Sequence, residues 1–510
     1  MGSNTTEQIA QQGHQSIPAD AFNTDSKDVE VGFSGSRDGS DITLTADLVD
    51  WDGPDDPENP HNWTRKQKAA SIALVSAITF ITPLASSIFA PSIEQVMAEF
   101  NSSSPQLASF IVSVYLIGYC FGPLVIAPLS EMYGRSLLYN ICNVLFVIFS
   151  VACALAPSLN SLIGFRLLCG LAGSCPLTIG AGSLADMIGP EKRGMAMSWW
   201  VCGPLLGPVV GPIAGGYLSE AKGWRWSFWV VAIAAGVITI ATFVFLRESY
   251  AFTILDRKAK RLRKETGNDN LRSVMDTGRS TKDIFKLAIV RPTKMLLFSP
   301  IVFLLSLYMA ILYGYLYLIF TILPSLFELE YGFSTGNIGL TYLGTGIGSA
   351  LGLLINAMVS DRLALRLKKQ HGGDHQPEYR LPPTMFACFL VPLGLFWFGW
   401  TAEFHEHWIL PILGTGAFGL GTVVIFMAAS VYIVDAFGVY AASATAASTV
   451  FRSLLGALLP LGGRDLFSAL GLGWGSSLLG FLALAMTPMP FLFHKYGERI
   501  RRKRLFNVEF

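Results

Sequence analysis

Charged residues are scarce in this chain. Asp, Glu, Lys and Arg make up 14% of its 510 residues, whereas a soluble domain carries about 25%. Apolar residues make up 52% and gather in long runs such as 69–91 and 137–156. A helix needs about 20 mostly apolar residues to cross a bilayer. Because these runs are apolar on every face, a large soluble core is excluded, and the sequence predicts an integral membrane protein.

The residue patterns that carry enzyme chemistry are also missing. The seven cysteines form no CxxC pair and lie inside apolar runs, and the seven histidines lie in tails, loops or run ends without metal-ligand spacing. No GxxxxGK[ST] loop for nucleotide phosphates occurs. We therefore expect no enzyme activity, no metal or other cofactor, and neither ATP nor nucleic acid as a partner.

Twelve membrane spans can be drawn, and a polar insert divides them into two sets of six. The spans are 69–91, 105–127, 137–156, 161–184, 194–218, 224–246, 296–323, 337–358, 382–400, 408–434, 440–463 and 473–493. The predicted fold is an all-α membrane protein with two pseudo-symmetric six-helix bundles. Its parts are a disordered tail (1–65), a first bundle (66–246), a linker (247–295), a second bundle (296–494) and a basic tail (495–510).

Basic residues indicate which way the spans face. With the N-terminus inside, 32 of the 37 Lys and Arg residues fall on inner segments; the outer loops hold Lys222, Arg225 and Arg464, and the spans hold Arg166 and Arg452. Cytoplasmic loops keep the excess of Lys and Arg. Both termini and the linker are therefore expected in the cytoplasm.

One outer loop contains a glycosylation pattern. It is the first outer loop, and it reads Asn101-Ser102-Ser103, which matches the N-x-[ST] acceptor. The loop is short and close to the membrane, so we expect Asn101 to stay unmodified.

The two halves repeat a pair of opposite charges. Glu131 and Arg135 follow span 2, and Asp361 and Arg362 follow span 8. Such repetition is typical of transporters built from two related bundles. An acid and a base at inner helix ends can pair in one conformation and thereby latch it. The alternative is an ordinary anchor for lipid headgroups.

Span 5 has glycine at every fourth position. The series includes Gly207, Gly211 and Gly215, with Gly216 next to the last and Pro208 and Pro212 between them. Glycines at this spacing leave a bare ridge against which another helix backbone packs closely, and prolines remove hydrogen bonds and bend a helix. The pattern predicts a hinge or seal. Tight packing alone would explain the glycines but not the regular prolines.

Arg166 lies inside span 4. A charge at that depth costs about 2.5–3.5 kcal/mol on insertion scales, and it is a functional candidate by default. The alternative is a structural role in which Arg166 bonds to the backbone carbonyls of a neighbouring helix.

Acids are absent from the middle of every predicted span. Those nearest to the bilayer are Glu131, Asp186, Asp361 and Asp435, all at inner ends. Burial or a neighbouring Arg can tune such carboxyls, so each is a candidate proton carrier. Asp435 ranks first because its own loop holds no basic residue. The alternative for Asp435 is a cap for the helix that begins near Val439.

Span 7 is rich in tyrosine. Tyr308, Tyr313, Tyr315 and Tyr317 are candidates for the wall of a substrate cavity, because aromatic rings with polar tips suit flat amphipathic ligands. Some of them are alternatively anchors at the membrane interface. Without an acid at mid-membrane, a neutral or weakly acidic ligand is favoured over a strongly cationic one.

Several stretches resemble the major facilitator superfamily. Residues 129–135 are similar to its loop between helices 2 and 3, 162–170 to its helix-4 motif, 203–216 to the antiporter signature of its exporters, and 83–91 to a helix-1 signature of drug:proton antiporters. Matches to the fungal twelve-helix drug:proton antiporter family lie at 56–63, 223–226, 379–383, 434–444 and 496–499. The sequence departs from the loop pattern at Ala127, Glu131 and Ser136, and from the helix-4 motif at Cys169. The resemblance runs from about residue 51 to about residue 504.

The resemblance implies a function. It implies two bundles that rock around a central cavity and export small amphipathic compounds, such as a drug, a toxin or a fungal secondary metabolite. It also implies proton antiport, with Arg166 in coupling and the proton gradient as energy source. We further expect a monomer in the plasma membrane, with lipid and a small-molecule substrate as partners. An importer or uniporter for a nutrient and a non-transporting sensor remain alternatives; an importer lacks the span 5 signature.

The orientation can be tested with an epitope tag in the linker, next to Asn268. Because the linker is expected in the cytoplasm, antibody should reach the tag only after the plasma membrane is permeabilised. Labelling of the tag on intact cells would reverse the assigned orientation.

Overall fold

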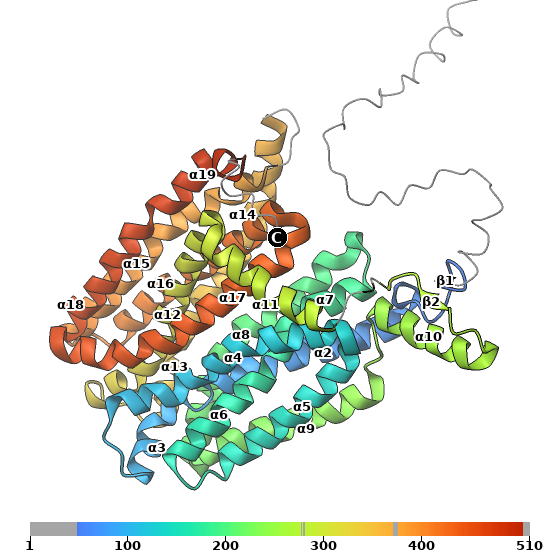
Figure 1. Cartoon of the computed structure of the whole chain (residues 1–510). Coiled ribbons are helices and arrows are strands. Elements are labelled where there is room, and N and C mark those ends of the chain that lie inside the picture. Colours follow the sequence, from blue (N-terminus) through green and yellow to red (C-terminus); the bar gives the residue numbers. More distant parts are fainter. Residues whose placement is uncertain (1–47, 277, 279–280, 371–375, 503–510) are drawn as a thin grey trace, which may run out of the picture. The chain divides into compact units, whose positions relative to one another are not determined.

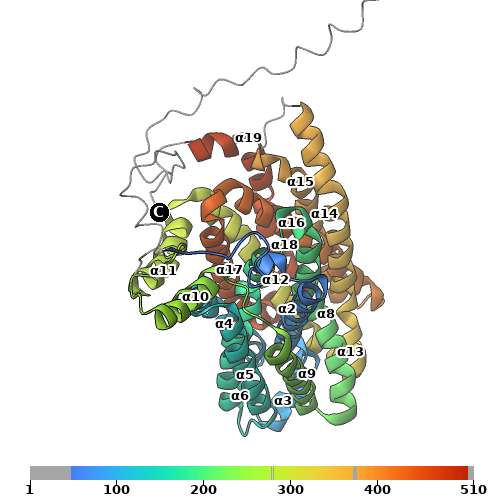
Figure 2. The ribbon, with the colours of Figure 1, turned by 90° about the vertical axis from the view of Figure 1, so that its right-hand side faces the viewer.

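The computed structural model describes residues 48–276, 278, 281–370 and 376–502 (Figures 1 and 2). Contacts group Val49–Phe510 into one unit, to which the following description refers. In the described residues the regular structure is helical apart from two short strands, β1 (Leu48–Val49) and β2 (Arg272–Ser273). The predicted all-α character is confirmed.

The first half of the chain forms the helices drawn in blue to green in Figure 1. They are α2 (Arg65–Ser87), α3 (Ile93–Glu99), α4 (Pro105–Tyr133), α5 (Arg135–Ala154), α6 (Leu159–Gly173), α7 (Cys175–Met187), α8 (Pro190–Lys222) and α9 (Arg225–Phe245). Helix α2 starts at a capping box, in which Thr64 and Gln67 satisfy each other's backbone N–H groups. A 3-10 turn, η2 (Ala90–Ser92), separates α2 from α3.

The second half forms the helices drawn in yellow to red. They are α12 (Pro300–Leu329), α13 (Thr335–Thr341), α14 (Leu343–Gln370), α15 (Pro382–Glu403), α16 (Ile409–Phe437), α17 (Ala441–Leu458), α18 (Gly463–Met486) and α19 (Pro488–Arg502). Short 3-10 turns, η3 (Pro377–Arg380), η4 (Gly438–Tyr440) and η5 (Leu459–Gly462), connect some of them. The linker contributes α10 (Ala251–Thr266) and α11 (Thr281–Phe298).

Ten helical stretches of the described residues are long and apolar enough to cross a membrane. One of them, Ala441–Arg501, is interrupted at Gly471, whose backbone is not helical (φ 75°), so it contains two arms. Helix α8 is not among the ten. The predicted number of twelve stays a prediction; it would require these two arms to be counted separately and α8 to be added.

Helices pack both within each half and between the halves. In the first half α2 lies on α8 and α4 lies on α6; in the second half α12 lies on α17, and α16 lies on α14 and α15. The halves meet where α4 packs on α17 and where α8 packs on α13. These two seams are the contacts that any relative movement of the halves must change.

The segment before α2 is ordered from Leu48 onwards, although the sequence predicts a disordered tail up to residue 65. Strand β1 pairs with β2 of the linker, and Figure 1 shows both strands beside α10. Trp63 is buried in a cluster with Leu184 and Met187 of α7. Residues 1–47 of the predicted tail lie outside the described residues.

A buried ion pair joins this segment to the linker. The Asp56 carboxylate accepts the backbone N–H groups of Asp52 (2.9 Å) and Glu58 (2.8 Å). Lys258 of α10 is buried, with its Nζ 2.6 Å from an Asp52 carboxylate oxygen and 3.6 Å from an Asp56 carboxylate oxygen. The two backbone donors, helped by Lys258, hold the pKa of Asp56 below its ordinary value.

Replacing Lys258 with Met should release the segment from α10, because it leaves the buried Asp56 carboxylate without its cation. Loss of one partner of a buried pair costs about 3–5 kcal/mol. Amide exchange of Asp52 and Glu58, followed by mass spectrometry, should therefore accelerate at least ~100-fold. Lys260→Met is the matched control: Lys260 pairs with Asp256 on the exposed side of α10, so its loss should change exchange little.

The same segment should respond to pH. A lowered folded pKa stabilises the docked segment above the unfolded value of about 3.9, and this contribution is lost as pH falls through the folded value. Exchange of the Glu58 amide should therefore rise only below about pH 4. Release that begins near neutral pH would show that another group controls docking.

Candidate functional site

Arg166 is buried between helices, with 1% of its surface exposed. It stands on α6, and its guanidinium donates to four backbone carbonyls. Two are on α4, those of Ile111 (2.7 Å) and Val112 (3.3 Å). The other two belong to α2, those of Ala85 (3.3 Å) and Ser86 (2.8 Å). Arg166 therefore joins three helices of the first half.

The two α2 carbonyls are available because they lie at the C-terminal end of that helix. Helix α2 ends at Ser87, and the last four carbonyls of a helix have no N–H partner within it. Ala85 and Ser86 are in that last turn, where the negative end of the helix dipole also favours a cation. The ring of Phe89 lies 4.3 Å from the guanidinium carbon and adds a cation–π contact.

Each nitrogen of the Arg166 guanidinium thus donates to at least one backbone carbonyl, without a carboxylate. This is the geometry that the structural alternative anticipated. It stabilises the end of α2 in this conformation, and a role in proton coupling stays a prediction.

Arg135 lies in a polar cluster near the linker. Its Nε is 3.4 Å from an Asp186 carboxylate oxygen of α7, and the ring of Tyr250 is 4.6 Å from its guanidinium carbon. Glu248 accepts the backbone N–H groups of Arg135 (2.9 Å) and Ser136 (3.2 Å), which caps the start of α5. Burial raises the pKa of the Tyr250 phenol, which lies outside the spans.

The geometry of this cluster refines the predicted latch. All of its members come from the first half and its connection to the linker, so the cluster holds one half together and does not join the two halves. Glu131 is exposed and makes no hydrogen bond or ion pair with a described residue. Sequence reasoning missed Glu248; its only signal was its place as the first acid after span 6.

A related cluster occurs in the second half. The Asp435 carboxylate is 3.5 Å from Nε of Arg380 in η3, so its basic partner comes from another loop. Asp435 does not cap the next helix, because neither η4 nor α17 has a side-chain cap. Asp361 is part of α14, but its side chain lies outside the described residues.

Next to Arg380 is an acid that sequence reasoning overlooked. Glu378 is buried, and its carboxylate accepts two bonds of 2.8 and 2.7 Å from one terminal nitrogen of Arg501. The Tyr432 hydroxyl also donates to it (3.3 Å). The buried pair ties α19 to the loop before α15. The only signal in the sequence was its position directly before the 379–383 motif.

The span 5 glycines form a bare ridge on α8, as predicted. A Cβ added to Gly207 would lie 2.8 Å from the Leu84 nitrogen, and one added to Gly211 would lie 2.8 Å from the Leu84 oxygen. On Gly215 it would overlap the Ile88 carbonyl. This face of α8 therefore packs directly on the backbone of α2 and its C-terminal end.

The prolines and Gly216 give α8 two further contacts. Because Pro212 has no N–H, the carbonyl of Pro208 one turn earlier lacks its helical partner; the Ser87 hydroxyl donates to it at 3.3 Å. On another face, a Cβ added to Gly216 would lie 2.7 Å from the Thr335 carbonyl of α13. One helix thus touches α2 of its own half and α13 of the other half.

The four tyrosines of α12 divide between two faces. Tyr313 and Tyr317 are one turn apart, with ring centroids separated by 5.1 Å. The Tyr317 hydroxyl is 3.0 Å from the Ser86 hydroxyl, across the contact between the halves. Tyr308 and Tyr315 are seven residues apart and share the other face; both are buried. Only the first pair points toward the first half.

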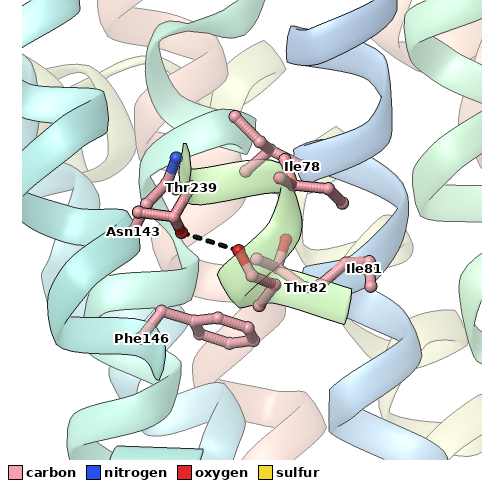
Figure 3. A pocket seen from close by; sticks show the side chains of 8 residues that line it. Ile78, Ile81, Thr82, Asn143, Phe146 and Thr239 are labelled. Atoms are coloured by element: carbon pink, nitrogen blue, oxygen red, sulfur yellow. Dashed lines mark hydrogen bonds between the residues drawn. The ribbon is translucent and has the colours of Figure 1, made fainter. Parts of the chain in front are cut away.

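Two cavities adjoin these helices. The smaller has a volume of about 10 Å³, room for about one water molecule. Figure 3 shows its polar residues, Thr82 of α2, Asn143 of α5 and Thr239 of α9. The larger cavity measures about 490 Å³ and lies beside Glu94 and Arg464, which form an ion pair of 2.7 Å between the halves.

Asn101, in the predicted glycosylation pattern, is exposed and has a backbone φ of 50°. The prediction that it stays unmodified remains a prediction.

Comparison with known proteins places these features in a family. The sequence pattern of the Major Facilitator Superfamily matches residues 75–460. The chain is 58% identical to "MFS-type transporter penM" of Penicillium rubens over 95% of both chains. It is 51% identical to "Efflux pump radE" of Floropilus chiversii over 91% of this chain and 86% of that protein.

Solved structures show the same fold. A bacterial homologue of the human lysosomal transporter Spinster, in an inward-facing conformation, has a TM-score of 0.63 at 13% identity, covering 87% of this chain and all of that chain. The xylose transporter XylE from E. coli, in a partially occluded inward-open conformation, gives 0.62 at 14% identity, covering 84% and 98%.

These helices, with their buried guanidinium group and glycine ridge, are those of a polytopic membrane transporter. The chain belongs to the Major Facilitator Superfamily. The predicted fold class is confirmed, and because its relatives and its fold are those of transporters, the protein is a transporter and not an enzyme.

Arg166→Lys tests whether the planar guanidinium is needed. A lysine ammonium keeps the charge but cannot reproduce a fork of donors aimed at two helices. We expect transport by Arg166→Lys to fall nearly as far as that of Arg166→Ala, while substrate binding remains. Efflux from vesicles with an imposed pH gradient and equilibrium binding measure the two properties. A normal pumping rate in Arg166→Ala would remove Arg166 from coupling, and failure of both variants to fold would make it structural.

Proposed function

We propose that this protein exports small amphipathic organic compounds, such as drugs, toxins or fungal secondary metabolites, by proton antiport with alternating access. The observation that carries the proposal is the double contact of α8. Its glycine ridge lies on the backbone of α2, and its Gly216 face lies on α13 of the other half. The name of the similar protein "Efflux pump radE" supports export as the direction.

The packing of α8 suits a movement between two states. A ridge of glycines has no side chains that interlock with the facing helix, so nothing has to be unpacked when the helix tilts. The carbonyl of Pro208 has no hydrogen bond within α8 and accepts one from the Ser87 hydroxyl of α2 instead. Helix α8 therefore lacks one of its own backbone hydrogen bonds at this point and can bend there. We infer that α8 and α2 tilt together against α13 when the halves rock.

The energy source in this proposal is the proton gradient, without ATP or a bound cofactor. The candidates for proton coupling are Arg166 and the acids at the ends of the spans, with Asp435 first. Asp435 is paired with Arg380 at 3.5 Å, and in this proposal the pair separates when the halves rock. The protein would act as a monomer in the plasma membrane, with both termini in the cytoplasm.

Replacing Gly211 with Val tests the proposal. The added side chain would push against the Leu84 carbonyl and the Ser87 hydroxyl, so close approach of α8 to α2 would be lost. In a yeast strain without its own pumps, we expect wild-type protein to lower the accumulation of some members of a compound panel. Gly211→Val should lose at least ~10-fold of that export, about 1.4 kcal/mol, at an equal amount of protein in the membrane.

The matched control is Gly236→Val on α9. Gly236 is also a helical glycine of the first half, but a Cβ there would meet nothing within 4 Å. This variant should export normally. Normal export by Gly211→Val would show that the ridge serves only for packing. If wild-type protein changed the accumulation of none of the compounds, that result would contradict export itself.

A further inference from the structure

A second arginine lies within the spans, and it is bound in a different way. Arg452 of α17 has its guanidinium carbon 4.9 Å from the ring of Phe426 on α16 and 5.5 Å from the ring of Tyr313 on α12. Its Nε is buried without a hydrogen-bond partner. Within the described part of the chain, none of its nitrogens makes a hydrogen bond or an ion pair.

Arg452 lies beside the contact between the halves. One turn further along α17, a Cβ on Gly456 would meet both Leu116 of α4 and Tyr313 at 2.8 Å, so this side of α17 faces the first half. Tyr313 packs on Tyr317, which is hydrogen-bonded to Ser86 of α2. The guanidinium is therefore surrounded by aromatic rings, at the junction of helices from both halves.

The phenol of Tyr119 on α4 is a second buried polar group in this region. Its hydroxyl makes no hydrogen bond of good geometry with a described residue, although Thr82 and Tyr115 lie near it. Tyr119 and Tyr317 are within electrostatic range of the Arg452 guanidinium. Buried donors are normally satisfied, so the buried Nε of Arg452, which has no acceptor among the described residues, indicates a missing acceptor.

The described residues supply no counterion at this depth. Their ion pairs, such as Arg135–Asp186, Arg464–Glu94 and Arg380–Asp435, all lie at helix ends, in loops or in the linker. A buried charge without a counterion costs several kcal/mol per ion. Arg166 meets this cost with four carbonyls. Arg452, whose side chain is half-buried, has among the described residues only ring faces, which favour a cation weakly.

We propose that Arg452 is the anion-binding residue for the substrate, and that this transporter carries flat organic acids in their anionic form. This inference rests on the proposed export function and specifies its substrate class. The rings of Tyr313 and Phe426 would pack on the flat body of the ligand. The guanidinium fork would donate to its oxyanion, and the Tyr119 hydroxyl would donate to it as well.

A pair of probes with one ring system tests this charge preference. 1-Anilinonaphthalene-8-sulfonate is anionic, and N-phenyl-1-naphthylamine is its neutral counterpart without the sulfonate. Full-length protein in liposomes with an imposed pH gradient should move the anion at least ~10-fold faster than the neutral probe, about 1.4 kcal/mol. In Arg452→Gln the ratio of the two rates should fall to about one. Arg452→Lys should give a ratio between these values.

The possible results separate this inference from the proposed function. An unchanged ratio in Arg452→Gln, or a wild-type protein that moves the neutral probe as fast as the anion, would overturn the role of Arg452 and leave export intact. Movement of neither probe by the wild-type protein would count against the export of amphipathic compounds itself.

Thermal unfolding in detergent gives a second measurement. Among the described residues Arg452→Met removes no hydrogen bond, so it should unfold at or above the wild-type temperature. Arg166→Met is the matched comparison and should unfold at a lower temperature, because it leaves the last carbonyls of α2 without donors. The sulfonate probe should raise the unfolding temperature of wild type but not of Arg452→Met. An equal loss of stability in both variants would make Arg452 a structural residue and contradict the proposal.

Discussion

A bilayer offers no water to hydrogen-bond polar groups, so every carbonyl, hydroxyl and charge within it must find a partner in the protein. The end of α2 shows what this constraint does to the fold. Helix α2 stops at Ser87, and its last carbonyls need donors. Arg166 from α6 supplies them while also bonding to α4. Arg166, whose charge is costly to place inside the bilayer, thereby becomes the residue that joins three helices of the first half.

The same constraint organises α8. Proline removes an N–H and frees a carbonyl one turn earlier, and Ser87 of α2 fills that position at Pro208. Glycine brings the backbones of α8 and α2 together, so hydroxyl and carbonyl come within reach. Three helices thus converge on the end of α2: α6 through Arg166, α8 through its ridge, and α12 through the bond between Tyr317 and Ser86. Because α12 belongs to the second half, this hydrogen bond connects the end of α2 to that half.

Charges that can stay near water follow another rule. Arg135 pairs with Asp186, Arg380 with Asp435 and Arg501 with Glu378, all close to the ends of spans. Lys258 and Asp56 form a similar buried pair outside the spans, between the linker and the segment before α2. The first pair joins two helices of one bundle, α5 and α7, and the other pairs fix a loop or a terminal helix to a bundle. The loops around the two bundles are therefore held by ion pairs, and the bundles themselves by backbone contacts and small residues.

Much about this protein could be read from the sequence, because composition and spacing along one helix are local properties. The scarcity of charge predicted the membrane spans, and glycine at every fourth residue of span 5 predicted a ridge without side chains. The lack of any nucleophile or metal motif agreed with a transporter. The buried arginines were visible for the same reason, since a charge inside an apolar run stands out whatever surrounds it.

Tertiary structure decided which groups meet. Lys258 and Asp56 are about 200 residues apart, and no local pattern relates them; the order of residues 48–62 was missed for that reason. Asp435 looked unpaired because its own loop has no base, yet Arg380 arrives from before α15. Two arginines that are equivalent in sequence context also separate. The carbonyls at the end of α2 satisfy Arg166, whereas among the described residues Arg452 meets only rings, because helix ends from distant parts of the chain come together at one place and not at the other.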